Sequence, residues 1–392
     1  MTFVPPRNGR TNHQGGVPSS PAGPLAGDAS LGLGSRNLRD GLSSVDAGPF
    51  AFRGRRTLRC TIRLCLLVFE ALRAVDIYLA AKRLRGLVPR TPLRRSDALS
   101  TLTGRDVWLK LESQQLTGSF KVRGAFNAIA ALPDDVRARG VVASSAGNHG
   151  MGVAFAAHHF GIPARIFVPS TAPKVKKQGI ARLGAEVDDS EPDYDAAMVA
   201  AKAWARTHAS TFINPCLGDT LLAGQGTVAL EIIEELPQLD TVVVCVGGGG
   251  LLGGMGSLLR RVAPHVRIIG VQSVNTAAMA RSLAAGRLVE IPSVPTLADG
   301  LAGQIDDEAL DIGQHALDEM ITLEEEEIAT AIAWLQEREG LTVEGSGAVG
   351  VGALLHGRVR EPGDCVAVVV SGSNIDAEKH RAVLEAHGAL RI

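Results

Sequence analysis

One lysine, Lys121, lies where the chain could carry out covalent chemistry. It belongs to the stretch Thr117-Gly-Ser-Phe-Lys-Val-Arg-Gly124, between an expected strand at 107–111 and an amphipathic helix over 122–132. The helix would turn its first N–H groups and the positive end of its dipole toward the amine. A second positive charge is disfavoured there, which favours a neutral, nucleophilic amine. On this stretch alone, a solvated lysine in a first helical turn is the simpler interpretation.

Four consecutive glycines follow an expected apolar strand at 241–246 and open a helix. Because they lack Cβ atoms, several backbone N–H groups can converge on one anion at the helix N-terminus. The spacing differs from that of a nucleoside triphosphate loop, and the acidic residue of the dinucleotide fingerprint is missing. The run predicts a phosphate site, with a turn needed only for close packing as the alternative. The glycines are Gly247, Gly248, Gly249 and Gly250.

Two further loops place small polar residues after expected strands. The loop Ser144-Ser-Ala-Gly-Asn-His-Gly150 offers N–H groups and the Asn148 amide to a carboxylate or phenolate. His149 taken by itself is a helix-opening histidine without a catalytic role. Ser371 ends another apolar strand, and in isolation it is a capping hydroxyl.

Strand-like and helix-like segments alternate along most of the chain, which predicts an α/β fold with open, mostly parallel sheets flanked by helices. Two nearly independent β–α–β series favour two lobes with a cleft between them, and loops at strand C-termini carry function. The expected strands are 107–111, 140–144, 164–168, 186–188, 241–246, 267–271 and 365–370, and the expected helices include 149–160, 174–183, 196–207, 224–236, 251–262 and 324–338.

Composition excludes several classes of partner. The net charge of −1 gives no reason to expect nucleic acid. No apolar run approaches the roughly 20 residues of a membrane span. The five cysteines are scattered without zinc-ligand spacing, as expected in a reducing cytoplasm. The Gly-, Pro- and Ser-rich segment 1–69 is expected to be a disordered extension.

Taken together and in this order, the segments resemble the threonine/serine dehydratase family of pyridoxal-phosphate enzymes. That family shares the two-lobed fold of the tryptophan synthase β-subunit, known as fold type II. The resemblance covers about residues 70–380. The matching segments are Ser119-Phe-Lys-x-Arg-Gly124, Ser145-Ala-Gly-Asn-His149, Ala223-Gly-Gln-Gly-Thr227, the glycines 247–250, Leu297-Ala-Asp-Gly300, Glu344-Gly-Ser-Gly-Ala348 and Ser371-Gly-x-Asn374.

The resemblance implies a role for each candidate. Lys121 would form the Schiff base with the cofactor aldehyde and later remove the substrate α-proton. The glycines 247–250 would hold the cofactor phosphate, Asn148 its ring hydroxyl, and Ser371 would face the pyridine nitrogen. A neutral hydroxyl there does not hold a proton on the ring, which favours prompt loss of a β-leaving group. The residues expected to contact substrate are Ser145, Ala146, Asn148 and His149.

The implied reaction is dehydration and deamination of a β-hydroxy amino acid, such as L-threonine or L-serine, to a 2-oxo acid and ammonia. The resemblance also implies a large cofactor-binding domain over 70–139 and 216–392, a small mobile domain over 140–215, and a dimer or tetramer. The chain ends soon after the last motif, so feedback inhibition by isoleucine is not expected.

Departures from the family pattern narrow the activity. Ala146 stands where serine racemases of the family carry a second serine, so racemisation is disfavoured. Several relatives bind a divalent cation through a glutamate and an aspartate, and the matching positions here include Gln272, Ser273 and Ala278. An amide and a methyl group cannot replace two carboxylates around a hard cation, so no metal requirement is expected.

Three alternatives remain open from the sequence. The stretches 277–279, 343–350 and 371–376 resemble the hydroxyectoine-utilisation dehydratase branch, whose substrate is not simple threonine. A β-replacement enzyme would keep the cofactor but would need an added nucleophile such as a thiol. A nucleotide-binding sensor without catalysis would be colourless and would release no ammonia.

Overall fold

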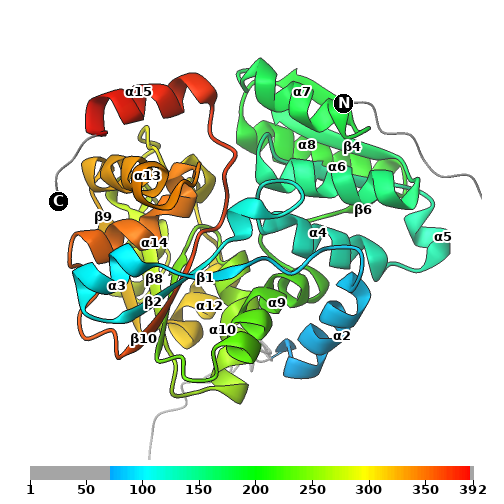
Figure 1. Ribbon diagram of the computed structural model, residues 1–392. Helices are drawn as coiled ribbons and strands as arrows, with labels where there is room; N and C mark the ends of the chain where they lie inside the picture. The colour runs from blue at the N-terminus through cyan, green and yellow to red at the C-terminus, as the bar shows by residue number, and fades with distance from the viewer. Residues whose placement is uncertain (1–70, 389–392) are drawn as a thin grey trace, which may run out of the picture. The chain divides into compact units, whose positions relative to one another are not determined.

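The computed structural model describes residues 71–388, so the predicted extension over 1–69 lies outside the described residues. Ten strands within this range form two sheets, and only β1 runs antiparallel to its neighbour (Figure 1). The predicted α/β fold with mostly parallel sheets is therefore confirmed. The six-stranded sheet has the order β1 (Leu93–Arg95), β2 (Asp106–Lys110), β10 (Cys365–Val369), β7 (Thr241–Cys245), β8 (Arg267–Ser273) and β9 (Glu319–Leu323), and the four-stranded sheet has the order β5 (Glu186–Glu191), β4 (Ala164–Pro169), β3 (Val141–Ser144) and β6 (Thr211–Phe212).

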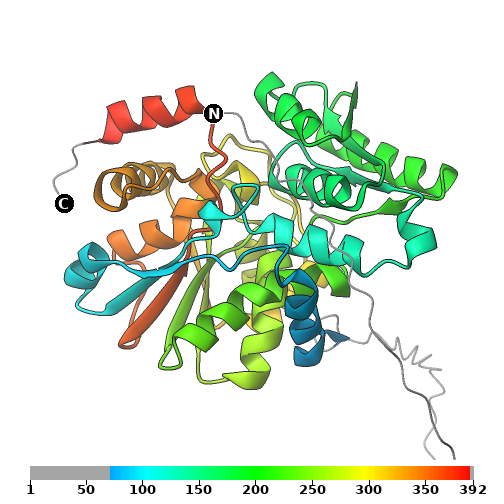
Figure 2. The same cartoon turned by 45° about the vertical axis from the view of Figure 1, so that its right-hand side comes forward.

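Helices cover both sheets. Figure 1 and Figure 2 both show α6, α7 and α8, in green, grouped around the strands of the four-stranded sheet. The helices are α2 (Ala74–Leu84), α3 (Asp97–Thr103), α4 (Lys121–Ala130), α5 (Asp134–Arg137), α6 (Asn148–Phe160), α7 (Lys174–Arg182), α8 (Tyr194–Thr207), α9 (Asp219–Glu235), α10 (Gly250–Val262), α11 (Ala278–Ala285), α12 (Asp307–Ala316), α13 (Glu325–Glu339), α14 (Gly345–Leu355) and α15 (Ala377–His387), with short 3-10 turns at Glu112–Gln114, Val274–Thr276 and Asp299–Leu301.

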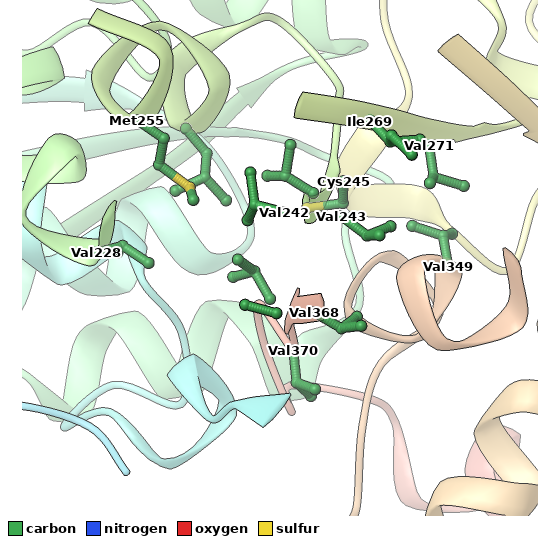
Figure 3. Packing of buried hydrophobic residues seen from close by; sticks show 14 of the residues in the cluster. Val228, Val242, Val243, Cys245, Met255, Ile269, Val271, Val349, Val368 and Val370 are labelled. Atoms are coloured by element: carbon green, nitrogen blue, oxygen red, sulfur yellow. The ribbon is translucent and has the colours of Figure 1, made fainter. Parts of the chain in front are cut away.

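The central strands of the larger sheet form a rigid base for the loops that follow them. Every residue of β7 and β10 is buried, because helices cover both faces of the parallel sheet. The strands are rich in valine, whose branched side chain suits a pleated, buried surface. Figure 3 shows valines of these strands, among them Val243 and Val368, packing together with Val349 of α14.

The helix that begins at Lys121 is held tightly between two others. α4 packs against both α6 and α9. A Cβ added at Gly152 of α6 would lie 3.2 Å from the Val122 Cα, and one at Gly224 of α9 would lie 2.5 Å from the Arg123 carbonyl oxygen. Glycine at position 224 therefore permits a helix contact too close for a side chain, and glycine at position 152 permits a tight one, so the first turn of α4 is packed from both sides.

A buried ionic cluster, formed by Arg123, Glu112, Glu231 and Lys110, joins α4 to β2, α9 and the turn after β2. The Arg123 side chain is 1% exposed, and it donates from Nε to Glu112 Oε2 at 2.7 Å and from Nη1 to Glu231 Oε1 at 2.6 Å. Lys110 Nζ donates to Glu231 Oε2 at 2.6 Å. Burial opposes ionisation, but the bonds from Arg123 and Lys110 hold the pKa of Glu231 below its ordinary value. Two cations thus balance two carboxylates, and one of the cations, Arg123, is two residues after Lys121.

Each predicted strand and helix overlaps an observed element, with the largest difference at α9, which begins at Asp219 rather than at 224. Strands β1, β6 and β9 were not predicted. The four-stranded sheet falls within 140–215, whereas residues 71–388 belong to one compact unit, so the division into two domains stays a prediction. Among the described residues, no helix combines the length and apolarity needed to cross a membrane.

Replacing Arg123 with methionine should remove the main partner of both carboxylates in the ionic cluster. Breaking a buried ion pair from one side costs about 3–5 kcal/mol of unfolding free energy. Urea unfolding followed by circular dichroism measures this loss. The control is Arg95→Met, which removes exposed, solvent-screened pairs with Asp97 and Asp106 and should leave the free energy of unfolding nearly unchanged. Equal, small losses in the two variants would show that the cluster does not anchor α4.

Candidate active site

The predicted site segments all follow the C-terminal ends of parallel strands. The stretch with Lys121 comes after β2, the four glycines after β7 and Ser371 after β10, and these three strands lie side by side in the larger sheet. The loop 144–150 follows β3 of the smaller sheet. Parallel strands end at one edge of a sheet, where ligands of α/β proteins bind. The structure thus brings the predicted residues to one region.

The amine of Lys121 is half-buried, and Nζ donates to the Pro215 carbonyl oxygen at 2.8 Å. His149 donates from Nε2 to the Ile213 carbonyl oxygen at 2.9 Å. Both acceptors lie in the segment 213–216 that follows β6. No role was predicted for this segment, because the strand before it has only two residues and leaves no pattern in the sequence.

His149 is buried, and burial together with nearby Lys121 lowers its pKa to about 3. The ring is therefore neutral at physiological pH, and its bond to the Ile213 carbonyl oxygen places the proton on Nε2. Nδ1 is buried without a partner in the described part of the chain. The predicted contact of His149 with substrate stays a prediction.

The four glycines form a cradle in which a side chain would be crowded or strained at several positions. Gly249 has φ +83°, in the left-handed region, immediately before α10 begins at Gly250. A Cβ at Gly248 would lie 2.6 Å from the Cys216 Sγ, and one at Gly250 would lie 3.0 Å from the Cys216 carbonyl oxygen. N–H groups in the first turn of a helix have no partner within the helix, so the cradle presents donors to an anion.

Neutral polar groups lie at the end of β10. Ser371 is 2% exposed, and its Oγ lies 3.5 Å from the Ser346 carbonyl oxygen. The neighbouring Cys245 thiol is protonated, because burial raises its pKa to about 11. Ser119, fully buried and bridged to Gly372, has an Oγ without a partner among the described residues. The region around Ser371 therefore offers hydroxyl and thiol groups.

Asn148 connects the smaller sheet to the larger one. Its Nδ2 donates to Glu344 Oε1 at 2.7 Å, and its Oδ1 accepts from Asn374 Nδ2 at 2.6 Å. Glu344 and Asn374 belong to the matching motifs, but neither was given a role from the sequence. In the same loop the Ser145 hydroxyl accepts from the Gly147 N–H at 3.2 Å, and half-buried Ala146 supplies only a methyl group.

Gln272 and Ser273, at positions that differ from metal-binding relatives, make hydrogen bonds within the chain. Gln272 is buried, and its Oε1 accepts from the Ala280 N–H at 3.1 Å. Ser273 donates to Glu325, and buried Ala278 begins α11. Within residues 71–388, no group of three or more His, Cys, Asp or Glu side chains is arranged as metal ligands. Independence from magnesium and calcium stays a prediction.

These residues fit pyridoxal phosphate: the glycine cradle suits its phosphate, the Lys121 amine its aldehyde, and neutral donors its ring. The sequence profile described as "Pyridoxal-phosphate dependent enzyme" matches residues 84–372, most of the chain. The chain belongs to this family. The resemblance inferred from the motifs is thereby confirmed.

Members of the family with similar sequences and structures include ammonia-lyases and racemases. An L-threonine ammonia-lyase of Thermotoga maritima is 45% identical over 302 residues, which are 77% of this chain and 75% of the relative. Maize serine racemase superposes with a TM-score of 0.77 at 31% identity, covering 81% of this chain and 98% of that chain. Threonine deaminase isoform 2 of Solanum lycopersicum superposes with a TM-score of 0.75 at 30% identity. The match covers 80% of this chain and 87% of that chain.

A methyl group added at Gly248 should push against the Cys216 Sγ and distort the cradle. We expect Gly248→Ala to weaken binding of pyridoxal phosphate to the apoenzyme about tenfold, as for other overpacked sites. Fluorescence titration measures the dissociation constant. Gly179→Ala is the control, since its nearest neighbour is the Met151 Sδ at an ordinary 3.7 Å. Adding Cys216→Ala should restore part of the affinity, and wild-type affinity in Gly248→Ala would contradict the cradle.

Proposed function

We propose that this protein catalyses dehydration and deamination of a β-hydroxy amino acid, L-threonine or L-serine, to a 2-oxo acid and ammonia. The observation that carries the proposal is the convergence of half-buried Lys121, the glycine cradle and Asn148 at the ends of parallel strands. The similarity to an L-threonine ammonia-lyase over most of both chains supports the same reaction class.

Lys121 is the proposed acid–base residue. When bound, pyridoxal phosphate supplies an electron-withdrawing ring for the electrons released at the substrate α-carbon. Lys121 would hold the cofactor through its aldehyde, and the lysine amine would take the substrate α-proton as a general base. Its hydrogen bond to the Pro215 carbonyl oxygen would keep the amine near the site.

The other residues would bind and orient. The N–H groups of the glycine cradle would hold the phosphate, and Asn148 would donate to the ring oxygen. Donors of the loop containing Ser145 and Ala146, among them the Ser145 hydroxyl and the Ala146 N–H, would hold the substrate carboxylate. Ser371, a neutral hydroxyl, would face the ring nitrogen without keeping it protonated. Loss of the β-hydroxyl, together with a proton as water, would then be favoured over return of the α-proton.

Ala146 makes the reaction one-sided. Its methyl group carries no titratable proton, so this position would not supply the second acid that the serine of the racemase pattern supplies. The proposed product is therefore a 2-oxo acid rather than a racemised amino acid. The maize relative with a similar fold is a serine racemase, so the proposed elimination would be a different reaction on a shared fold.

A second candidate substrate is a hydroxy amino acid derived from hydroxyectoine. Two departures favour it: Gly345 in place of the proline usual in the family motif, and Ser373 in place of a glycine. Ser373 donates to the Ser113 carbonyl oxygen at 2.8 Å, and Gly345 lies against the Leu297 carbonyl oxygen, so both change the packing around the site. A substrate series that includes both kinds of amino acid separates the two candidates.

We also propose a domain movement, an oligomeric state and a cellular compartment for this protein. The small segment 140–215 is proposed to move as a domain when substrate binds, and the protein is proposed to act in the cytoplasm as a dimer or tetramer. A small amino acid is the proposed partner, with no role for nucleic acid or membrane. Sedimentation of the purified protein and compartment-specific tagging address these points.

Replacing Lys121 with alanine should lower kcat for ammonia release at least about 1000-fold, since general base catalysis and the covalent link to the cofactor are both lost. Ammonia and 2-oxo acid are measured without added thiol, over threonine, serine and a hydroxyectoine-derived amino acid. Lys82→Ala, at an exposed position of α2, is the control and should keep wild-type turnover. A wild-type protein that needs a thiol would indicate β-replacement, and one that releases no ammonia would contradict the elimination.

A further inference from the structure

The Asn148 amide is fixed by groups on both of its ends. Glu344, 6% exposed at the start of α14, accepts from Asn148 Nδ2 at 2.7 Å. On the other side, Asn374 Nδ2 donates to Asn148 Oδ1 at 2.6 Å and to the Thr117 carbonyl oxygen at 2.8 Å. The amide oxygen thus faces a donor, and the amide nitrogen faces an acceptor.

Only one orientation of the Asn148 amide satisfies these neighbours. A primary amide nitrogen carries two hydrogens, and both hydrogens of Asn374 Nδ2 already have acceptors. A flipped Asn148 would turn its oxygen toward the Glu344 carboxyl and its NH₂ toward another NH₂. In the observed orientation one N–H of Asn148 is used by Glu344, and the second remains for a ligand.

We propose that Glu344 is a positioning residue of this site, which holds the Asn148 amide so that its second N–H faces the ring oxygen of pyridoxal phosphate. The identity of that ligand rests on the proposed function, whereas the orientation follows from the hydrogen bonds. Gly372 is part of the same arrangement, because a Cβ there would collide with Glu344 Oε1. The glycine leaves room for the carboxyl beside the strand end.

The surroundings place the titration of Glu344 in the neutral range. Burial first, and then the charge of Asp299, raise its pKa to about 7, while the Asn148 hydrogen bond and Lys176 act in the opposite direction. Cys245 on β7 faces it as a neutral thiol. Above this pH the carboxylate accepts a stronger bond from Asn148 than the protonated acid does. The hydrogen bond from Asn148 to Glu344 therefore becomes stronger as the pH rises through neutrality.

The test compares Glu344→Gln and Glu344→Ala with wild-type protein. Each apoenzyme is titrated with pyridoxal phosphate, and the visible band of the bound cofactor is followed with pH. The wild-type band should change with a midpoint near pH 7, where Glu344 titrates. The glutamine amide oxygen can still accept from Asn148, so this variant should bind within about twofold of wild type but lose the pH transition.

Glu344→Ala removes the acceptor, so it should bind the cofactor about tenfold more weakly and lose the same pH transition. Glu308→Gln, at an exposed position of α12, should change neither quantity. A pH transition that persists in Glu344→Gln, or wild-type affinity in Glu344→Ala, would overturn the positioning role. Thermal unfolding of the apoenzymes identifies a variant that has lost its fold, and the glutamine variant then decides.

The two proposals fail in different ways. A wild-type protein that binds pyridoxal phosphate but releases no ammonia would overturn the proposed reaction, while affinity and visible band would still report on Glu344. A wild-type protein that does not bind pyridoxal phosphate would overturn both.

Discussion

The buried pairing of Arg123 with Glu112 and Glu231 is the interaction on which the placement of the candidate site depends. It joins the first turn of α4 to the turn after β2 and to α9, and Lys121 is the residue at which α4 begins. Buried charges are tolerated only when they are matched and hydrogen-bonded, so the cluster forms in one arrangement of these elements. The ionic cluster therefore fixes the position of the first turn of α4, where Lys121 lies.

Glycines near the site allow backbone segments to approach one another closely. Gly152 and Gly224 bring α6 and α9 against α4, and Gly248 brings the turn after β7 against Cys216. The segment containing Cys216 also supplies the acceptors for Lys121 and His149. The glycine cradle, the lysine and the histidine all contact one short segment after β6.

The sequence predicted the parallel sheets and the loops that carry the candidate residues, because buried strands and glycine turns leave strong local patterns. It did not predict α14, since the glycines of Gly345–Leu355 have poor helix propensity, and only packing against residues such as Val368 shows why they are present. Nor did it predict β6, which has two residues. The contact of Asn148 with Glu344 joins residues 196 positions apart, and no local pattern reveals such a pairing.

The central claim is that Lys121 is the residue that bonds to pyridoxal phosphate. Reduction of the holoenzyme with borohydride would make this bond permanent, and peptide mass spectrometry would then locate it. The account predicts loss of the visible band and a single modified lysine at position 121. A label on another lysine, or a reduced protein that carries none, would contradict it.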